Sequence, residues 1–297
     1  MLAPIIIFAF NRLEPLKNTI NSLLENPEAK DSDLFIFVDG PRSHKVGEEQ
    51  KVASVQEYIK SIKGFKNIEY YFSDINKGLG NSIIAGVTQI IHKYGQAIVL
   101  EDDLTFSKNF LSFMNQGLSK YQKEDKVFSI CGYSNQVHTP QNYNADTYFC
   151  TRSSSWGWAT WKDRWETIDW QLKNWEDIRK HKSGFNKWGG SDCFKMLEDW
   201  RNGKNQSWAI RFCFNQYLQQ KLSLFPIISK VNNNGFDGEG TNCKKWSRFK
   251  CHFDTENKTL FSFPKEIELN KKLFHSAMKY NSLMIRAWSK LMYIIYR

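Results

Sequence analysis

The hydrophobic positions of the first 130 residues form short apolar runs that alternate with longer amphipathic stretches. Apolar runs at 3–10, 33–40 and 97–103 and an alternating segment at 67–73 predict four strands. Between them, residues 14–26, 46–63 and 81–94 carry apolar side chains at helical spacing. Strands that alternate with helices predict βαβ units and a mostly parallel sheet covered by helices on both faces, an α/β fold.

Three of these predicted strands end in polar residues, namely Asn11-Arg12, Asp39-Gly40 and 101–103 (Glu-Asp-Asp). Ligands of open α/β sheets bind at the carboxyl ends of the strands. We therefore expect the three polar ends to face one crevice.

The three adjacent carboxylates at 101–103 repel one another, and a cation or a set of hydrogen-bond donors would relieve that repulsion. Carboxylate oxygens are hard ligands suited to Mn²⁺ or Mg²⁺. Such an ion would bridge to a diphosphate and stabilise charge on a departing nucleotide. A solvated acidic turn is the simpler alternative, but the position after a buried strand favours a metal site.

The pattern changes at about residue 140, where the chain becomes rich in Trp, Asn, Lys and Gly and poor in strand alternation. No Pro/Ser linker and no repeat separates the two halves, so we expect them to pack as one domain. The expected division is 1–135 for a ligand-binding half, 136–265 for a second half on the same domain and 266–297 for a helical tail.

The chain carries a net charge of +10, and aromatic residues make up 15% of it. A basic chain can bind nucleic acid, but the lysines are scattered and no nucleic-acid motif is present, so we expect no such partner. A groove for a polyphosphate or contact with an anionic membrane fits the charge as well. The rings indicate either core volume or a sugar-binding surface.

Two further features bear on location. The six cysteines form no CxxC pair, which favours free cytosolic thiols. The apolar start lacks a basic region and a cleavage site, so it predicts a buried strand rather than a signal peptide, and we expect a cytoplasmic protein. No apolar run approaches the length of a membrane span.

The last segment, 283–297, mixes large apolar residues with Arg286, Lys290 and Arg297. A basic amphipathic helix of this kind lies on the inner face of a membrane or docks on the core. On a membrane, Trp288, Tyr293 and Tyr296 would sit at the headgroups and the cations would meet anionic lipid. Both interpretations stay open.

Four short segments carry a family resemblance: FAFNR at 8–12, VDGPR at 38–42, NKGLGNSI at 76–83 and VLEDD at 99–103. In this order they resemble the donor half of GT-A glycosyltransferases, closest to bacterial family-2-like enzymes related to N-acetylglucosaminyltransferase I. SSWGWATWKDRW at 154–165 and GFDGEGTNC at 235–243 resemble the second-half motifs, so the resemblance covers roughly 3–245.

The resemblance implies a GT-A fold and an inverting, metal-dependent transfer of sugar from a nucleotide-diphosphate sugar, a UDP-sugar, to a glycan or lipid-linked oligosaccharide in bacterial surface polysaccharide or glycan synthesis. By position, Arg12 and Asp39 would contact the nucleobase, Asp102 would lie near the ribose and Asp103 would bind the metal. The complete donor set that it implies is Phe10, Asn11, Arg12, Asp39, Gly80, Asn81, Glu101 and Asp102.

Trp156, Gly157 and Trp158 are the candidates for contact with the donor or acceptor sugar. Aromatic faces pack against sugar rings, and a glycine lets the backbone approach a ligand closely. The alternative is that these rings belong to the core, and we expect at least two of the tryptophans at 156–165 to be buried.

Inverting transfer needs a general base that deprotonates the acceptor hydroxyl. The candidates are Asp192, Glu198 and Asp199, although a solvated helix surface explains any of these acids equally well. The resemblance of 198–201 (EDWR) to the segment that carries the base in N-acetylglucosaminyltransferase I points to Asp199.

The Gly-rich polar segment 232–242 is a candidate lid, with Asn234, Gly235, Asp237 and Asn242 over the diphosphate, or else a plain surface loop. The bacterial pattern often has His at the position of Asn242, and Asn would hold a metal or diphosphate less well.

Two other functions remain open. A nucleotidyltransferase shares the sheet and the carboxylates, but it carries a Gly-rich phosphate loop where this chain has residues 11–14 (NRLE). A non-catalytic carbohydrate-binding protein would not need the acidic strand end.

Overall fold

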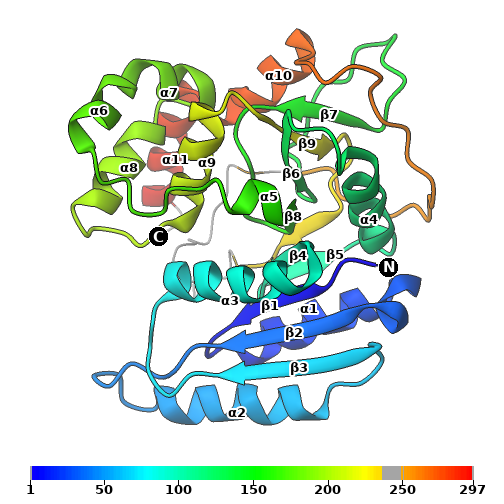
Figure 1. Ribbon diagram of the computed structural model, residues 1–297, viewed down its shortest axis with the longest axis vertical. Coiled ribbons are helices and arrows are strands. Elements are labelled where there is room, and N and C mark those ends of the chain that lie inside the picture. Colours follow the sequence, from blue (N-terminus) through cyan, green and yellow to red (C-terminus); the bar gives the residue numbers. More distant parts are fainter. Residues whose placement is uncertain (1, 236–248, 250, 296–297) are drawn as a thin grey trace.

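The computed structural model describes residues 2–235, 249 and 251–295. Its centre is an eight-stranded sheet in the order β3-β2-β1-β4-β8-β6-β9-β7, and β10 pairs with β5 in a second, two-stranded sheet (Figure 1). The strands are β1 (Ile5–Ala9), β2 (Asp33–Val38), β3 (Asn67–Phe72), β4 (Gln96–Glu101), β5 (Leu104–Phe106), β6 (Val127–Cys131), β7 (Thr147–Cys150), β8 (Trp158–Trp161), β9 (Leu222–Pro226) and β10 (Val231–Asn233).

The first four strands, β1 to β4, are parallel neighbours, with β1 between β2 and β4. The helices that connect them are α1 (Leu13–Leu24), α2 (Glu48–Ser61) and α3 (Leu79–Tyr94). Each lies where the hydrophobic spacing predicted it. The predicted α/β class with a mostly parallel sheet is therefore confirmed.

Strand β1 supplies side chains to both faces of the sheet because successive residues of a strand point in opposite directions. Ile5 and Ile7 belong to the core under α1, α2 and α4 (Phe110–Tyr121), while Ile6 and Phe8 belong to the core under α3 and α9 (Trp208–Leu218). This double burial explains why β1 reads as an uninterrupted apolar run.

The second half of the sheet contains strands that the sequence pattern did not predict. Strand β8 pairs antiparallel with both β4 and β6, β9 runs parallel to β6, and β7 pairs antiparallel with β9. The sequence of this half is poor in strand alternation and therefore gave no signal for these strands. Strands of four or five residues that are buried throughout show no alternation of polar and apolar positions.

The remaining helices cover this second half. They are α5 (Lys162–Trp165), α6 (Trp175–Lys180), α7 (Lys182–Gly189), α8 (Cys193–Arg201), α10 (Lys271–Met278) and α11 (Leu283–Ile295), together with the 3₁₀ turns η1 (Pro27–Asp31) and η2 (Lys279–Asn281). Helices α6 to α9 share a separate apolar cluster, and Figure 1 shows them gathered at one side of the molecule. Among the described residues, none of the helices has the length and apolar character needed to cross a membrane.

The cysteines agree with the expected absence of pairing. Cys131, Cys150, Cys193, Cys213 and Cys251 are free thiols, and burial raises the pKa of Cys131 and Cys193 to about 12. Cys243 lies outside the described residues.

Candidate functional site

The carboxyl ends of the neighbouring strands β1 and β4 bring residues 10–12 and 101–103 into contact, where the sequence predicts a crevice, and we call this group the acidic crevice. The Phe10 backbone N–H donates to Asp102 Oδ2 over 3.3 Å, and Arg12 Nη1 donates to Asp103 Oδ2 over 3.0 Å. Arg12 and Asp103 are each only 16% exposed at their side chains. Arg12, which the resemblance places at the nucleobase, thus contacts Asp103, which the resemblance places at the metal ion.

The carboxylates of this crevice are buried close together, which disfavours their charged forms. Burial, followed by repulsion from Asp103 and Asp102, raises the pKa of Glu101 to about 8. Burial and Asp103 raise the pKa of Asp102 to about 7, against the opposing charge of Arg12. Ionisation of all three carboxylates at neutral pH is therefore unfavourable unless a positive charge offsets their repulsion.

These residues fit a divalent ion that is completed by its substrate. The described residues contain no group of three His, Cys, Asp or Glu side chains that could hold a metal by themselves. Mg²⁺ and similar ions are commonly held by one or two carboxylates, with substrate phosphates and water as the other ligands. The hard carboxylate oxygens of Asp103 and its neighbours suit such an ion, which would offset the repulsion among them.

Asp39, at the end of β2, shapes the loop that leads into α3. Its Oδ1 accepts the Lys77 backbone N–H and its Oδ2 accepts the Gly78 backbone N–H, both over 2.8 Å. The same carboxylate also accepts the Gly40 N–H over 3.2 Å. Asp39 thus holds the loop beside the crevice, and its expected contact with a nucleobase stays a prediction.

A second ion pair supports the end of β1 from the side of α2. Asn11 Nδ2 donates to Glu48 Oε1 over 3.0 Å, and the Arg42 guanidinium and backbone N–H both donate to the Glu48 carboxylate. Hydrogen bonds from Arg42 lower the pKa of Glu48 to about 2. Glu48 was missed in the sequence because only the fold brings it to Asn11. Arg42 lies within the VDGPR motif, which was the available signal.

The start of α3 packs tightly on the second half of the chain. A Cβ on Gly80 would overlap the Gln206 carbonyl oxygen, and one on Gly78 would overlap the Gln206 side chain. Asn81 is exposed, and its Nδ2 donates to the Lys77 carbonyl over 2.9 Å. Gly80 is therefore required for packing, and the expected place of Gly80 and Asn81 beside a nucleotide sugar remains a prediction.

The described part of the candidate lid lies against the crevice. The Asn234 backbone N–H donates to the Asp103 carbonyl over 2.9 Å, and the Gly235 N–H donates to Asn233 Oδ1 over 2.7 Å. A Cβ on Gly235 would overlap the Asp103 carboxylate. Asp237 and Asn242 lie outside the described residues.

The aromatic segment divides between core and cavity. Trp158 in β8 is 1% exposed and stacks on Trp208 at 4.8 Å between ring centroids, so its expected sugar contact is wrong. Gly157 has a φ of +64°, and a Cβ there would meet Val231 at 2.9 Å, so a left-handed turn and close packing explain this glycine, and its contact with a ligand stays a prediction. Trp161 is also buried, which confirms the expectation that at least two of these tryptophans are core residues.

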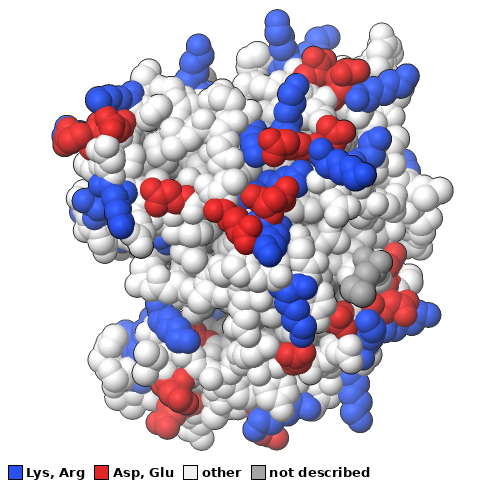
Figure 2. Space-filling view, in the orientation of Figure 1, with Lys and Arg blue, Asp and Glu red and all other residues white. Residues whose placement is uncertain are grey.

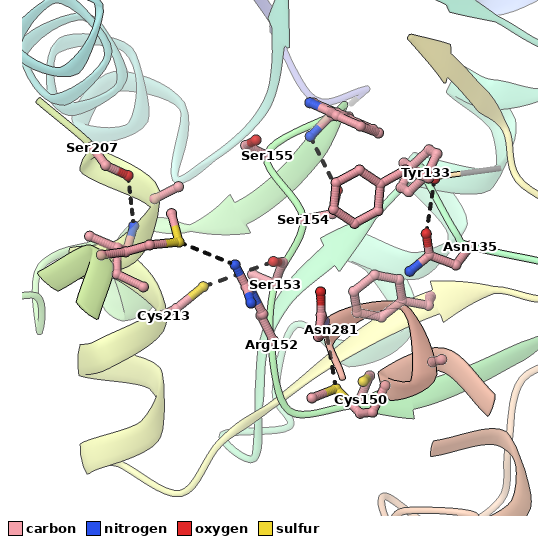
Figure 3. A pocket seen from close by; sticks show the side chains of 18 of the residues that line it. Tyr133, Asn135, Cys150, Arg152, Ser153, Ser154, Ser155, Ser207, Cys213 and Asn281 are labelled. Carbon is pink, nitrogen blue, oxygen red and sulfur yellow. Dashed lines mark hydrogen bonds between the residues drawn. The ribbon is translucent and has the colours of Figure 1, made fainter. Parts of the chain in front are cut away.

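Trp156, in contrast, lines a cavity of about 270 Å³. Its ring lies edge-on to Tyr133, with 4.6 Å between ring centroids. Figure 3 shows the cavity walls coming from the strands, from α9 and from the C-terminal helices, with Arg152 and Ser153 between them. Its polar lining includes Asn135, Arg152, Ser153, Ser154, Ser155, Ser207 and Asn281. A cavity that combines aromatic rings with hydroxyl and amide groups has the chemistry of a carbohydrate site.

Arg152 is fixed at the edge of this cavity by Asp192. Arg152 Nη1 donates to Asp192 Oδ1 over 2.9 Å and to the Gly189 carbonyl over 3.1 Å. Burial alone would raise the pKa of Asp192, but the charge and hydrogen bond of Arg152 outweigh it and hold that pKa below its ordinary value. Asp192 is thus committed to a structural pair, which weakens it as a candidate base. Arg152 itself carried no signal in the sequence.

Glu198 and Asp199 lie near the end of α8, beside a residue of the cavity wall. Asp199 pairs with Lys195, its backbone carbonyl accepts the Lys204 N–H over 2.8 Å, and Met196 of the same helix lines the cavity. Glu198 approaches Lys182 of α7 at 3.8 Å. The turn after α8 runs through Gln206 to Ser207, and so connects the packing against α3 with the cavity wall.

Charged side chains of both signs are interspersed over the face shown in Figure 2. That face carries no continuous basic stripe of the kind that follows a nucleic-acid backbone. The excess of 10 positive charges is thus not gathered there.

The family model and the sequence relative that match this chain are both glycosyltransferases. The family model described as Glycosyl transferase family 2 matches residues 5–199. The alpha-1,3-mannosyl-glycoprotein 2-beta-N-acetylglucosaminyltransferase of Arabidopsis thaliana is 21% identical over 269 residues, which cover 82% of this chain and 57% of that protein. The chain thus spans a little over half the length of this relative.

Solved structures match this chain at low similarity. S. aureus TarS 1-349 has a TM-score of 0.44 and 11% identity, and the match covers 80% of this chain and 61% of that one. UDP-glucose pyrophosphorylase complexed with UDP-glucose has a TM-score of 0.38 and 13% identity, with 76% of this chain and 90% of that chain covered.

Proposed function

Because the chain belongs to glycosyl transferase family 2, and thus to the glycosyltransferases, we propose that it transfers a sugar from a nucleotide-diphosphate sugar to a carbohydrate acceptor with the help of Mn²⁺ or Mg²⁺. The observation that carries this proposal is the acidic crevice, where Arg12 pairs with Asp103 at the joined ends of β1 and β4, next to the carboxylates of Asp102 and Glu101. Such a site suits a cation and the phosphates that the cation would neutralise.

On this proposal, residues 1–135 bind the donor, 136–265 supply the acceptor side and 266–297 form a tail. Asp103 would hold the ion, with Asp102 and Glu101 adding negative charge. The ion would offset the charge that develops on the nucleotide diphosphate as it leaves. Asp39 would orient the nucleotide by fixing the 77–78 loop.

The donor is proposed to be a UDP-sugar. The Arabidopsis relative is named for transfer of N-acetylglucosamine, so UDP-N-acetylglucosamine is the first donor to test. The acceptor would be a glycan or a lipid-linked oligosaccharide in surface polysaccharide or glycan synthesis.

The acceptor is proposed to enter the cavity at Trp156. Trp156 would pack on a sugar face, while the serine hydroxyls and Asn281 would bind its hydroxyl groups. Asp199 would act as the general base for an inverting transfer, because α8 contributes Met196 to the cavity wall and its last turn leads to the residues packed on α3.

A thermal-shift screen of nucleoside diphosphates with and without Mn²⁺ tests the proposal. A ligand that binds only the folded protein raises its unfolding temperature. We expect UDP with Mn²⁺ to stabilise the protein more than UDP alone, and more than the other nucleotides do. Donor hydrolysis should likewise require the metal. Equal stabilisation by every nucleotide, or hydrolysis that is unaffected by chelation, would overturn the proposal.

A further inference from the structure

Helix α11 presents its large apolar side chains to solvent. Leu283, Met284, Trp288 and Leu291 are 70%, 82%, 55% and 48% exposed, in that order. Met284, Trp288 and Leu291 follow the i, i+4, i+7 spacing of one helical face. A helix that served only to close the core would turn this face inward.

The opposite side of α11 holds the helix against the protein. Ser289 is 1% exposed, and Ile285 and Met292 are half-buried. Arg286 Nη1 donates to Ser191 Oγ over 2.8 Å, in the turn between α7 and α8. The helix is therefore docked through a small polar residue and a hydrogen bond, and its apolar face points away from the molecule. Docking on the core and an outward apolar face are thus compatible, although the sequence presented them as alternatives.

The segment of the chain that carries this face has charges of one sign. From Asn270 to Ile295 the chain contains no Asp or Glu. Lys271, Lys272, Lys279 and Lys290 are all exposed there. By helical spacing Lys290 borders the apolar face beside Ala287 and Leu291. An apolar strip with basic flanks is complementary to a surface that is apolar within and anionic at its rim.

We propose that α11 docks the folded protein on a lipid surface rich in anionic headgroups, with Met284, Trp288 and Leu291 in the acyl boundary and the lysines of α10, η2 and α11 at the phosphates. Arg286, expected from the sequence at the lipid, stays on the protein. The side chains of Tyr293 and Tyr296 and residue Arg297 lie outside the described residues. The proposal concerns attachment and does not depend on the reaction.

Vesicle flotation of the full chain tests this docking. Phosphatidylcholine vesicles with phosphatidylglycerol should carry the protein at low salt, and phosphatidylcholine alone should not. The double variant Trp288→Glu/Leu291→Glu should bind at least about tenfold more weakly, since each side chain would otherwise bury apolar surface. Lys279→Gln/Lys290→Gln should weaken binding about thirty-fold, because each cation near such a surface contributes about 1 kcal/mol.

The matched control is Leu260→Glu, which changes another highly exposed leucine, away from α11, and should float as the unchanged protein does. Circular dichroism of every variant checks the fold. Unaltered flotation of the Trp288→Glu/Leu291→Glu variant would refute the proposal. So would a full chain that ignores anionic vesicles, or one that forms a dimer which these same substitutions dissociate, because the face would then bind a second copy.

Discussion

Two arginine–aspartate pairs of almost equal length lie in different electrostatic surroundings. Arg12 meets Asp103 at 3.0 Å, and Arg152 meets Asp192 at 2.9 Å. At the first pair the neighbouring carboxylates have raised pKa values, about 8 for Glu101, whereas at the second pair the pKa of Asp192 is lowered. The comparison indicates that the first pair belongs to a site with surplus negative charge, and that the second is a balanced structural contact.

The largest effect is expected from Asp103→Ala at the first pair. Transfer should be abolished because the proposed metal ligand is removed. The fold should persist, since the change relieves repulsion and Arg12 still faces the charge of Asp102. Donor turnover in metal-replete buffer and a thermal melt measure the two effects. Full turnover of this variant would show that Asp103 holds no essential ion.

Asp192→Asn, at the second pair, should lower the stability of the fold and leave nucleotide binding unchanged. It leaves Arg152 buried without its carboxylate, and breaking such a pair costs about 3 kcal/mol of the free energy of unfolding. Nucleotide affinity should remain near its original value once the variant is folded. Denaturant unfolding and nucleotide titration check these outcomes. A stable variant with no turnover would instead identify Asp192 as the base.

The variant Asp199→Asn tests whether Asp199, which pairs with Lys195, acts as the general base. Turnover should fall by about 10²-fold, the usual weight of a general base, while nucleotide affinity hardly changes. Glu198→Gln, on the adjacent residue of the same helix, is the matched control and should retain turnover. Loss of turnover in the control alone would transfer the role to Glu198.

The smallest effect concerns the stability of the protein at low pH, to which the ion pair of Glu48 with Arg42, close to the first site, contributes. Hydrogen bonds from Arg42 lower the pKa of Glu48 to about 2 from an ordinary value of 4.5. The stabilisation is therefore complete above about pH 4.5 and is lost as the pH falls towards 2. Melting temperatures over this range should fall less steeply for Glu48→Gln than for the unchanged protein. Parallel curves for the two proteins would contradict the link.

The donor half was largely predictable because its signals are local. Strand β4 was expected at 97–103 and spans Gln96–Glu101, and the convergence of polar strand ends followed from a rule about parallel sheets. The charge surplus of the acidic crevice also followed from three adjacent residues.

The second half was not predictable in the same way. Strand β8 has the sequence WATW, and burial on both faces removed the alternation that marks a strand, so Trp158 was mistaken for a ligand contact. Arg152 pairs with Asp192 across 40 residues, a separation that no local pattern reveals. The contacts of Glu48 and Gln206 likewise depend on how distant segments meet.

The contact between Gly80 and Gln206 has an evolutionary consequence. A methyl group at residue 80 would overlap the backbone of residue 206, so no change of the Gln206 side chain could make room for it. Among natural variants of this chain, residue 80 should therefore drift away from glycine only together with an insertion or deletion near residue 206. Changes at residues 80 and 206 would then occur together in evolution. A chimera that joins halves from distant homologues should be destabilised at the contact between these two residues.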